Sequence, residues 1–335
     1  MRVLIEANHR YPIYGAVGSG RHPREFPSGS GWHMQDLLAR GLAELGHEVL
    51  YLLRRGCDRP LPEGVRLVSD PVSDADIYQS TTVAANHHDI REFLERRGLP
   101  AVYTCHLDRS DADEASRAGD NWIFVARSLA RTYGKERHVY NGIDPADCLF
   151  SRAKEEFLLF MAAAERAIPK GLCTALAVSK RTGVRLVVAG TGRSYAAIER
   201  ISGLCRDTGV EYIGDIRGAA KAEWLAAAKG VILPTGTNEG CPLTLIEALM
   251  SGTPVIASTA GGIPEVVAPD TGFLCNDEDD YVRAVGRLRE ISPDRCRQYA
   301  LERFHYLRMA RDYVVEFEAE IARHRDGQRR RPPGI

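Results

Sequence analysis

The chain has 335 residues, of which 44% are hydrophobic and 27% are charged, and its 44 basic and 45 acidic residues leave a formal net charge of −1. These values are typical of a folded soluble protein. They exclude wholesale disorder and the strongly basic balance of most nucleic-acid-binding proteins. At roughly 150 residues per domain, the length predicts two domains.

The amino terminus and the cysteines argue against secretion. Glu6 follows only three apolar residues, which is not the pattern of a signal peptide, and the longest apolar run, Phe157–Ala164, is far shorter than the ~20 residues of a membrane span. None of the eight cysteines forms a C-x-x-C pair. We therefore expect a cytoplasmic protein with free thiols, no stable membrane span and no metal site.

The first part of the chain alternates short apolar runs with longer amphipathic stretches. A helix is expected over Trp32–Leu45, where apolar residues recur at steps of three and four until Gly46. His87–Arg97 is also expected to be helical. Strands are expected over Arg2–Ala7, His47–Leu53, Val65–Val68, Asp76–Gln79, Ala101–Cys105 and Trp122–Ala126.

The same alternation resumes after Tyr140–Pro145, which contains the turn-forming pairs Asn-Gly and Asp-Pro and is typical of a linker. Strands are expected over Phe157–Ala163, Val184–Ala189, Glu211–Ile213, Gly230–Leu233 and Pro254–Ala257. Helices are expected over Gly171–Thr182, Ser194–Asp207, Ala219–Ala228, Pro242–Ser251 and from Leu288 to the end.

Strands that alternate with crossover helices predict parallel sheets, so we expect an α/β protein with two doubly wound, Rossmann-like domains facing a central cleft. The expected domains are residues 1–145 and 146–305. Residues 306–335 are expected to form a helix that returns to the first domain, followed by a basic tail.

The segment Thr237–Ala257 carries the clearest chemical signal. Pro242 suits the first turn of a helix, and the amides of Leu243 and Thr244 would then form an anion site at its positive end. Glu239 would repel a phosphate there and is expected to face hydroxyl groups. Glu247 by itself reads as a solvated or salt-bridged helix carboxylate.

Glu239 and Glu247 are eight residues apart, which is the E-x7-E spacing of retaining GT-B glycosyltransferases. The sequences SGTPVIAS and GGIPEVV that follow resemble glycosyltransferase family 4. Glu165–Gly171 resembles the family's phosphate-binding segment GR-x-x-x-x-KG. Arg166 precedes Lys170 by four residues where the family shows five, so either a one-residue deletion or an exchange with Glu165 is open.

Further segments resemble family motifs in the same order along nearly the whole chain. These are Gly29-Ser30-Gly31, Gly46-His47-Glu48-Val49, Thr104-Cys105-His106, Asn141-Gly142-Ile143-Asp144, Val188-Ala189-Gly190-Thr191-Gly192 and Tyr212-Ile213-Gly214. The long loop Asn8–Ser28 is interpreted either as a surface loop or as a lid over the substrates.

The resemblance implies transfer of a hexose from a nucleotide sugar, usually UDP-linked in this family, to a hydroxyl of a soluble small molecule or a glycan. It implies retention of the anomeric configuration and no cofactor or metal ion. The implied catalytic residues are His106, Glu239, Arg166 and Lys170. The residues implied to bind the nucleotide sugar are Gly29, Ser30, Gly31, Gly190, Gly192, Ile213, Gly240, Cys241, Leu243, Thr244 and Glu247.

Within this set the resemblance implies separate roles. Arg166 and Lys170 would stabilise the diphosphate leaving group, because both side chains are cationic. Glu247 would bind the ribose hydroxyls and Glu239 the hydroxyls of the sugar. His106 would face the sugar near its anomeric centre.

Other interpretations remain open on the sequence. A GT-B epimerase or hydrolase of nucleotide sugars, and a GDP-mannose-dependent transferase with a lipid acceptor, would share these motifs. An inactive sugar-nucleotide-binding protein is disfavoured by the presence of Glu239, Arg166 and Lys170. A dinucleotide-dependent oxidoreductase is disfavoured because no G-x-G-x-x-G follows a predicted strand.

Overall fold

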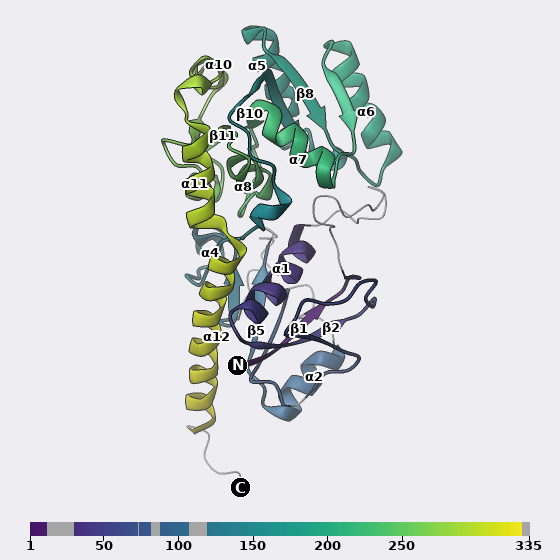
Figure 1. The fold of residues 1–335 in the computed structure, drawn as a ribbon, viewed down its shortest axis with the longest axis vertical. Coiled ribbons are helices and arrows are strands. Elements are labelled where there is room, and N and C mark those ends of the chain that lie inside the picture. The colour runs from purple at the N-terminus through teal and green to yellow at the C-terminus, as the bar shows by residue number, and fades with distance from the viewer. Residues whose placement is uncertain (12–29, 73, 82–87, 107–118, 330–335) are drawn as a thin grey trace. The chain divides into compact units, whose positions relative to one another are not determined.

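The structure is a computed structural model that describes residues 1–11, 30–72, 74–81, 88–106 and 119–329. The described chain forms two compact units: unit 1 contains residues up to Gly142 together with His305 and the residues after it, and unit 2 contains Ile143–Phe304 (Figure 1). Gly29 and most of the Asn8–Ser28 loop lie outside the described residues. Among the helices in these ranges, none is long and apolar enough to cross a bilayer.

Unit 1 contains a parallel sheet whose described strands follow the order β3-β2-β1-β4-β5-β6. The strands are β1 (Arg2–Ala7), β2 (Glu48–Leu53), β3 (Val65–Val68), β4 (Ile77–Thr81), β5 (Ala101–Cys105) and β6 (Trp122–Phe124). The helices before the linker are α1 (Ser30–Glu44), α2 (His88–Arg97) and α4 (Arg127–Thr132). The strand order reverses between β1 and β4, which lie side by side at the centre of the sheet.

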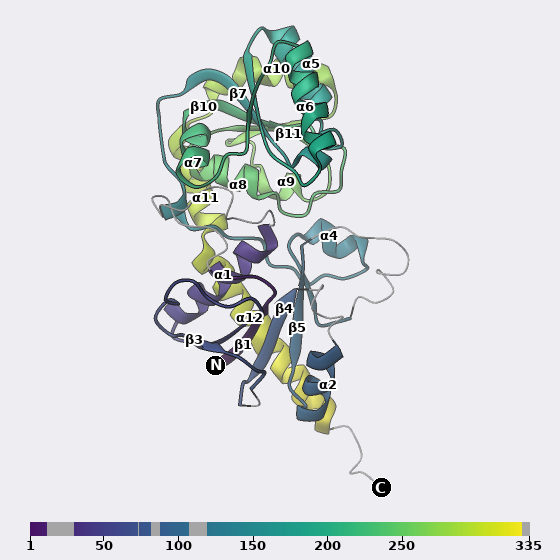
Figure 2. The ribbon, with the colours of Figure 1, turned by 90° about the vertical axis from the view of Figure 1, so that its right-hand side faces the viewer.

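The last helix of the chain, α12 (Tyr306–Arg329), packs along α1 and completes unit 1 (Figures 1 and 2). The helices approach closely at Gly41, where an added Cβ would lie 2.8 Å from the Cβ of Ala310. Arg137 donates to Glu316 at 2.6 Å and to Glu320 at 2.8 Å. These ion pairs and the close helix packing hold the carboxyl-terminal helix on the amino-terminal unit.

Unit 2 contains a second parallel sheet, and its described strands follow the order β12-β11-β10-β7-β8-β9. The strands are β7 (Glu155–Met161), β8 (Arg185–Ala189), β9 (Glu211–Gly214), β10 (Ala228–Leu233), β11 (Val255–Ser258) and β12 (Gly272–Cys275). The helices are α5 (Leu172–Thr182), α6 (Tyr195–Asp207), α7 (Gly218–Ala227), α8 (Leu243–Met250), α9 (Ile263–Val266), α10 (Glu278–Arg287) and α11 (Pro293–Phe304). Short 3₁₀ turns are η3 (Pro145–Asp147), η4 (Ala164–Arg166) and η5 (Leu288–Glu290).

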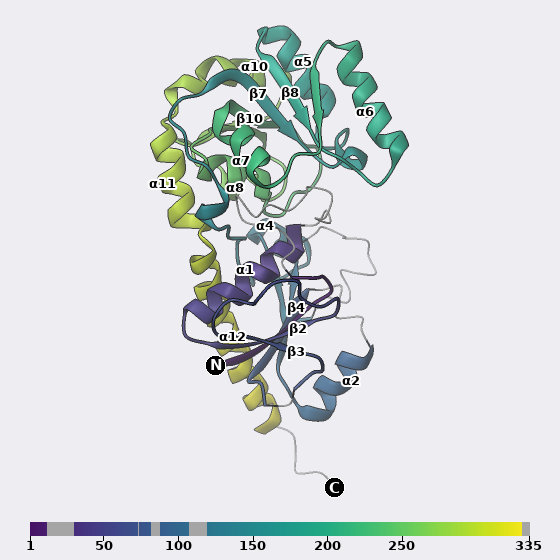
Figure 3. The ribbon, with the colours of Figure 1, turned by 45° about the vertical axis from the view of Figure 1, so that its right-hand side comes forward.

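Helices cover both faces of the sheet in unit 2 (Figures 2 and 3). Apolar side chains of α5, α6 and α10 share one buried cluster with residues of the strands. Helices α7 and α8 pack on the other face, where Trp224 meets Phe157 edge-on at a ring distance of 5.4 Å. Because both faces are buried, the strands are apolar along most of their length, as is usual in parallel sheets.

The predicted α/β architecture of two doubly wound units is confirmed, but some element assignments were wrong. The predicted strands Arg2–Ala7, Val65–Val68 and Ala101–Cys105 have the observed bounds, and the other predicted strands and the helices before Leu288 differ from the observed ones by one or two residues at their ends. Pro242 precedes α8 as its N-cap. Strand β12 and helix α10 were not predicted, because a four-residue strand followed by an acidic run reads as a loop. The predicted helix from Leu288 onward is interrupted at Ile291 and again at His305.

Candidate functional site

Two of the predicted site residues of unit 2, Lys170 and Glu239, lie where its strand order reverses. Strands β7 and β10 are neighbours at this point, and Lys170 follows the first while Glu239 follows the second. The carboxyl ends of parallel strands form a ligand-binding crevice at such a reversal. The topology therefore brings together two residues that are remote in the sequence.

Lys170 and Glu239 form an ion pair, with the Nζ atom of Lys170 3.1 Å from Oε2 of Glu239. The Glu239 side chain is only 11% exposed and that of Lys170 is 22% exposed. Oε1 of Glu239 accepts a hydrogen bond from Oγ1 of Thr237 at 2.7 Å and a longer one from Thr235 at 3.4 Å. The Glu239 carboxylate is thus held in one orientation with Lys170 as its cation.

The backbone around this pair is held by contacts between loops. The amide of Gly236 donates to the carbonyl of Pro169 at 3.1 Å, and the amide of Gly262 donates to that of Glu239 at 2.6 Å. Gly171 has φ +90°, and an added Cβ would lie 2.0 Å from the carbonyl oxygen of Pro234. Only glycine can therefore join the Lys170 loop to helix α5 at this spacing.

Glu247 lies in helix α8 and is also paired with a lysine. Nζ of Lys221, in helix α7, is 2.6 Å from Oε1 of Glu247, whose side chain is 15% exposed. The chain has far more arginine than lysine, yet both glutamates of the E-x7-E motif face a lysine ammonium. Glu247 is therefore salt-bridged, as one of the two interpretations of the sequence expected. Its partner, Lys221, was not predicted.

The start of helix α8 presents amides without a side-chain cap. Pro242 is the N-cap residue and has no side-chain acceptor, so the amides of Leu243 and Thr244 stand in an uncapped first turn. The preceding Gly240 and Cys241 are buried. Such a helix end favours an anion, because its unpaired amides carry roughly half a positive charge.

Glu165 and Arg166 are both exposed after β7, and the carboxylate of Glu165 binds a neighbouring loop. Glu165 accepts hydrogen bonds from the amides of Arg193 and Ser194 at 2.6 and 2.8 Å, and these amides lower the pKa of its carboxyl group. An added Cβ on Gly192 would lie 2.5 Å from this carboxylate. A negative charge therefore already lies against the amides of the loop after β8.

Gly190 is also required for close packing of strand ends. It has φ +148°, and an added Cβ would lie 1.8 Å from the carbonyl oxygen of Ala162. Its amide donates to the carbonyl of Gly214 at 2.7 Å, and its carbonyl accepts from the Tyr212 hydroxyl at 2.6 Å. These bonds place Ile213 and Gly190 on adjoining strand ends.

His106 belongs to unit 1, directly after β5. Its ring lies against the start of α1, because an added Cβ on Gly31 would be 3.1 Å from the Cδ2 atom of His106. Nε2 is buried and has no hydrogen-bond partner among the described residues. Burial lowers the pKa of His106 to about 4, so the ring is neutral at pH 7.

Sequence reasoning also missed the polar residues that hold the carboxylates. Thr235, Thr237 and Glu239 alternate in the loop after β10, and this spacing would place their side chains on one side of an extended segment. A second missed group lies in unit 1, where His9, Asp36 and Tyr51 form a buried hydrogen-bonded cluster. A histidine two residues beyond a buried strand was the available signal for it.

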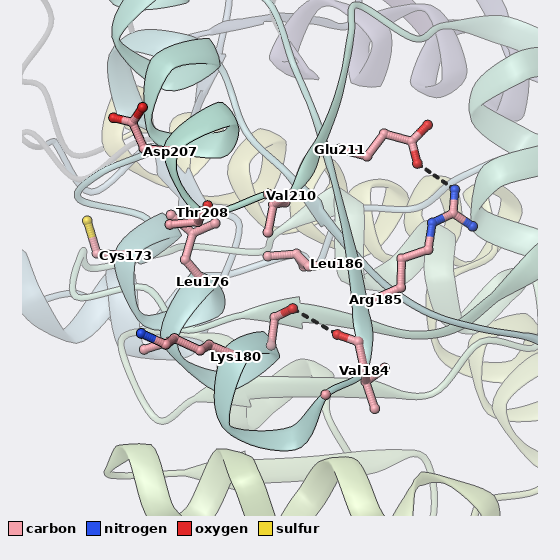
Figure 4. A pocket seen from close by; sticks show the side chains of 14 residues that line it. Cys173, Leu176, Lys180, Val184, Arg185, Leu186, Asp207, Thr208, Val210 and Glu211 are labelled. Carbon is pink, nitrogen blue, oxygen red and sulfur yellow. Dashed lines mark hydrogen bonds and ion pairs between the residues drawn. The ribbon is translucent and has the colours of Figure 1, made fainter.

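A pocket of about 930 Å³ lies elsewhere on unit 2 (Figure 4). It is lined by residues at the carboxyl ends of α5 and α6, such as Lys180 and Asp207, and at the amino ends of β8 and β9. Arg185 and Glu211 form an ion pair there. None of the predicted site residues lines this pocket, which lies at the opposite end of the strands from Lys170.

Comparison with known structures identifies the fold. The glycosyltransferase AviGT4, involved in avilamycin A biosynthesis, aligns with a TM-score of 0.74 and 23% identity over 96% of this chain and 98% of its own. The Anabaena protein HepE, solved with UDP and glucose, aligns with a TM-score of 0.69 and 15% identity over 95% of this chain and 100% of its own. Together with the two doubly wound sheets, these matches define the GT-B fold.

Sequence comparison identifies the family of the second unit. Residues 157–290 match the family model described as Glycosyl transferases group 1, so the recognition of a family 4-like GT-B glycosyltransferase is confirmed.

Two curated relatives align over part of the chain. The MMP alpha-(1->4)-mannosyltransferase of Mycolicibacterium hassiacum is 38% identical over 30% of this chain and 27% of its own length. A GDP-mannose-dependent monoacylated alpha-(1-6)-phosphatidylinositol monomannoside mannosyltransferase of Corynebacterium glutamicum is 31% identical over 34% of this chain and 30% of its own length. The chain thus aligns with less than a third of either relative.

Proposed function

We propose that the chain is a retaining glycosyltransferase that moves a hexose from a nucleotide sugar to an acceptor hydroxyl. The observation that carries the proposal is the ion pair between Lys170 and Glu239, at the reversal point of a sheet whose residues match group 1 glycosyltransferases. A cation and an oriented carboxylate side by side suit a substrate that joins an anionic diphosphate to a polyhydroxylated sugar.

The diphosphate is assigned to Lys170, Arg166 and the first turn of α8. Negative charge grows on the leaving diphosphate as the sugar departs, and fixed cations and amides stabilise that charge. No side chain caps the first turn of α8, so a phosphate that binds the amides of Leu243 and Thr244 does not have to displace one. The loop after β8 is a poorer place for the phosphates, because Glu165 already bonds to its amides.

The hydroxyl groups of the donor are assigned to the two carboxylates. We assign Glu239 to the hydroxyls of the transferred sugar. Its negative charge would then lie near the anomeric carbon, which gains positive charge in the transition state. Glu247 is to bind the ribose, whose contacts change little during the reaction. His106, neutral at pH 7, is to face the sugar as a hydrogen-bonding group.

The donor we propose is a UDP-hexose, in agreement with the family resemblance and with the UDP complex of HepE, which shares the fold. GDP-mannose is the second candidate, because the two relatives aligned above are named mannosyltransferases and one is named GDP-mannose-dependent. The acceptor we propose is a soluble small molecule or a glycan. The lipid named for the Corynebacterium relative makes a lipid hydroxyl the alternative.

The test is product analysis of the purified chain with UDP-glucose and with GDP-mannose. Each donor is incubated alone and with methyl α-D-glucopyranoside, methyl α-D-mannopyranoside, myo-inositol or phosphatidylinositol vesicles. Released nucleoside diphosphate and any new glycoside are measured, the latter by mass spectrometry and NMR. A glycoside with the α configuration of the donor supports retaining transfer.

Other products would contradict this proposal. Free sugar or an isomerised donor, equal with and without acceptor, would indicate a hydrolase or an epimerase. Donor binding without turnover would indicate an inactive binding protein. The same assay with EDTA tests the expectation that protein cations alone stabilise the diphosphate, and activity lost to EDTA and restored by manganese would refute it.

A further inference from the structure

His9 is the centre of a buried polar cluster in unit 1. Its Nε2 atom lies 2.8 Å from Oδ1 of Asp36, and the same oxygen accepts a hydrogen bond from the Tyr51 hydroxyl at 2.6 Å. His9 is 1% exposed, Asp36 7% and Tyr51 0%. The three side chains come from the segment after β1, from α1 and from β2, so the fold of the unit assembles the cluster.

The hydrogen bonds of this cluster assign a donor role to one nitrogen of the imidazole. Burial and the nearby Asp36 raise the pKa of Tyr51 well above its usual value, so the phenol keeps its proton and donates to the carboxylate. The same carboxylate oxygen then accepts a second hydrogen bond, from the Nε2–H group of His9. In a neutral imidazole with Nε2 protonated, Nδ1 carries a lone pair and can only accept.

The Nδ1 atom of His9 is buried and has no hydrogen-bond partner among the described residues. The ring is held in place by Trp32, which stacks on it at 6.1 Å with an interplanar angle of 20°, and by the edge of Tyr51 at 6.4 Å. Buried polar atoms in folded proteins nearly always have a partner. An oriented ring nitrogen without one therefore points to a ligand that supplies the missing partner.

The position of His9 in the sheet agrees with a ligand site. It lies two residues beyond β1, where the strand order of unit 1 reverses between β1 and β4. His106, beyond β5, contacts Gly31 at the start of α1, and the next residue, Trp32, stacks on His9. Two imidazoles, each with a buried nitrogen that has no partner among the described residues, thus flank the first turn of α1 at the carboxyl edge of the sheet.

We infer that Asp36 is the positioning residue that holds His9 in the tautomer with its proton on Nε2, and that the bare Nδ1 atom binds a hydroxyl group of the acceptor. This inference rests on the proposed function. A lone-pair acceptor selects a hydroxyl donor and disfavours a phosphate or carboxylate oxygen, because two acceptors repel. The acceptor group recognised here is accordingly a neutral sugar or polyol hydroxyl.

Two substitutions at His9 separate the roles of its nitrogens. In His9→Gln the side-chain amide reaches the place of Nε2 and preserves a donor to Asp36, but nothing replaces Nδ1. In His9→Asn the side-chain amide lies near the place of Nδ1 and the bond to Asp36 is lost. Tyr51→Phe is the matched control, because it removes one donor to Asp36 and leaves both nitrogens of His9.

The measurement is steady-state transfer to the methyl glycoside or inositol that the product analysis shows to be glycosylated, together with donor hydrolysis in the absence of acceptor. We expect His9→Gln to raise the acceptor KM by about tenfold or more, the cost of one buried hydrogen bond. Donor KM and acceptor-independent hydrolysis should stay within about twofold, as in Tyr51→Phe. Asp36→Asn should raise acceptor KM as well, because an amide that donates to Nε2 moves the imidazole proton to Nδ1.

An independent readout does not require turnover. Long-range ¹H–¹⁵N spectra of histidine-labelled protein should show Nε2 of His9 protonated and Nδ1 bare, and methyl α-D-glucopyranoside should shift the Nδ1 resonance. The inference is overturned if a folded His9→Gln protein keeps a wild-type acceptor KM, if it loses donor hydrolysis in parallel, or if Nδ1 carries the proton. A wild-type chain that releases no nucleoside diphosphate from any donor would instead refute the proposed function.

Discussion

Lys170 and Glu239 are 69 residues apart in the sequence and meet as a half-buried ion pair, Nζ to Oε2, at 3.1 Å. Glu239 compensates the charge of Lys170 in this pair. A diphosphate bound beside Lys170 would compete for the same ammonium and release Glu239 toward the hydroxyls of the sugar. The pair thus couples the proposed phosphate contact to the proposed sugar contact.

Replacing either proposed phosphate cation should slow the reaction. We expect Lys170→Ala and Arg166→Ala each to lower turnover about a hundredfold or more, because losing one stabilising donor typically costs ~3–4 kcal/mol in the transition state. Lys180→Ala is the matched control, since Lys180 is exposed on α5 at the pocket of Figure 4. Wild-type turnover of both site variants at saturating donor would contradict the phosphate assignment.

The two carboxylates should fail in different ways. Glu239→Gln should mainly reduce turnover, because its charge acts on the positive character of the transition state. It should bind a bare nucleoside diphosphate as tightly as the wild type or more tightly, since Lys170 then lacks its carboxylate competitor. Glu247→Gln should mainly raise donor KM. It should also weaken the binding of a nucleoside diphosphate by about 1.5–3 kcal/mol, the contribution of a hydrogen bond to a charged group.

Calorimetry with UDP and GDP measures the nucleotide affinity of both carboxylate variants, and steady-state kinetics measures their turnover and donor KM. The assignment of roles is wrong if Glu239→Gln loses nucleotide affinity while Glu247→Gln retains it. Circular dichroism of each variant serves as the control for folding. Lys221→Met gives a further check, because removing the partner of Glu247 should alter nucleotide affinity more than turnover.

Two glycines at the ends of helix α5 offer a matched pair for stability. Gly171 and Gly183 have φ +90° and +68°, so alanine at either position costs roughly 1–2 kcal/mol of left-handed strain. An added Cβ at Gly171 would also collide with the carbonyl of Pro234, whereas Gly183 has nothing within 4 Å. Gly171→Ala should therefore lower the melting temperature clearly more than Gly183→Ala, and equal shifts in a thermal melt would contradict this packing.

The buried His106 should make the stability of the chain depend on pH. Its folded pKa of about 4 lies below the ~6.5 of an unfolded histidine, so between these values the unfolded chain binds a proton that the folded chain does not. The free energy of unfolding should fall as the pH drops from 6.5 toward 4, by up to ~1.4 kcal/mol per pH unit. Thermal melts of wild type and His106→Gln at pH 7.5 and 5 test this, and the variant should lose less stability on acidification.

The arrangement of elements could be read from local patterns. Apolar runs such as Arg2–Ala7 and the three-and-four spacing within Trp32–Leu45 reflect burial of a strand on both faces and of a helix on one, and each signal is complete within a short window. The E-x7-E spacing is local in the same way, because Glu239 and Glu247 lie before and within one helix. Strand β12 (Gly272–Cys275) was not predicted, because its apolar run is short and an acidic run follows it.

Pairings between remote residues could not be read in this way. Lys170 with Glu239, Lys221 with Glu247, and His9 with Asp36 and Tyr51 depend on which strands become neighbours and on how each helix is rotated against the sheet. The turn of Glu165 toward the amides before α6 likewise depends on the packing of two loops. Composition and periodicity predict whether a residue is buried. Its partner from a remote part of the sequence depends on how all the helices and strands pack together, because every apolar face has to be buried in the same fold.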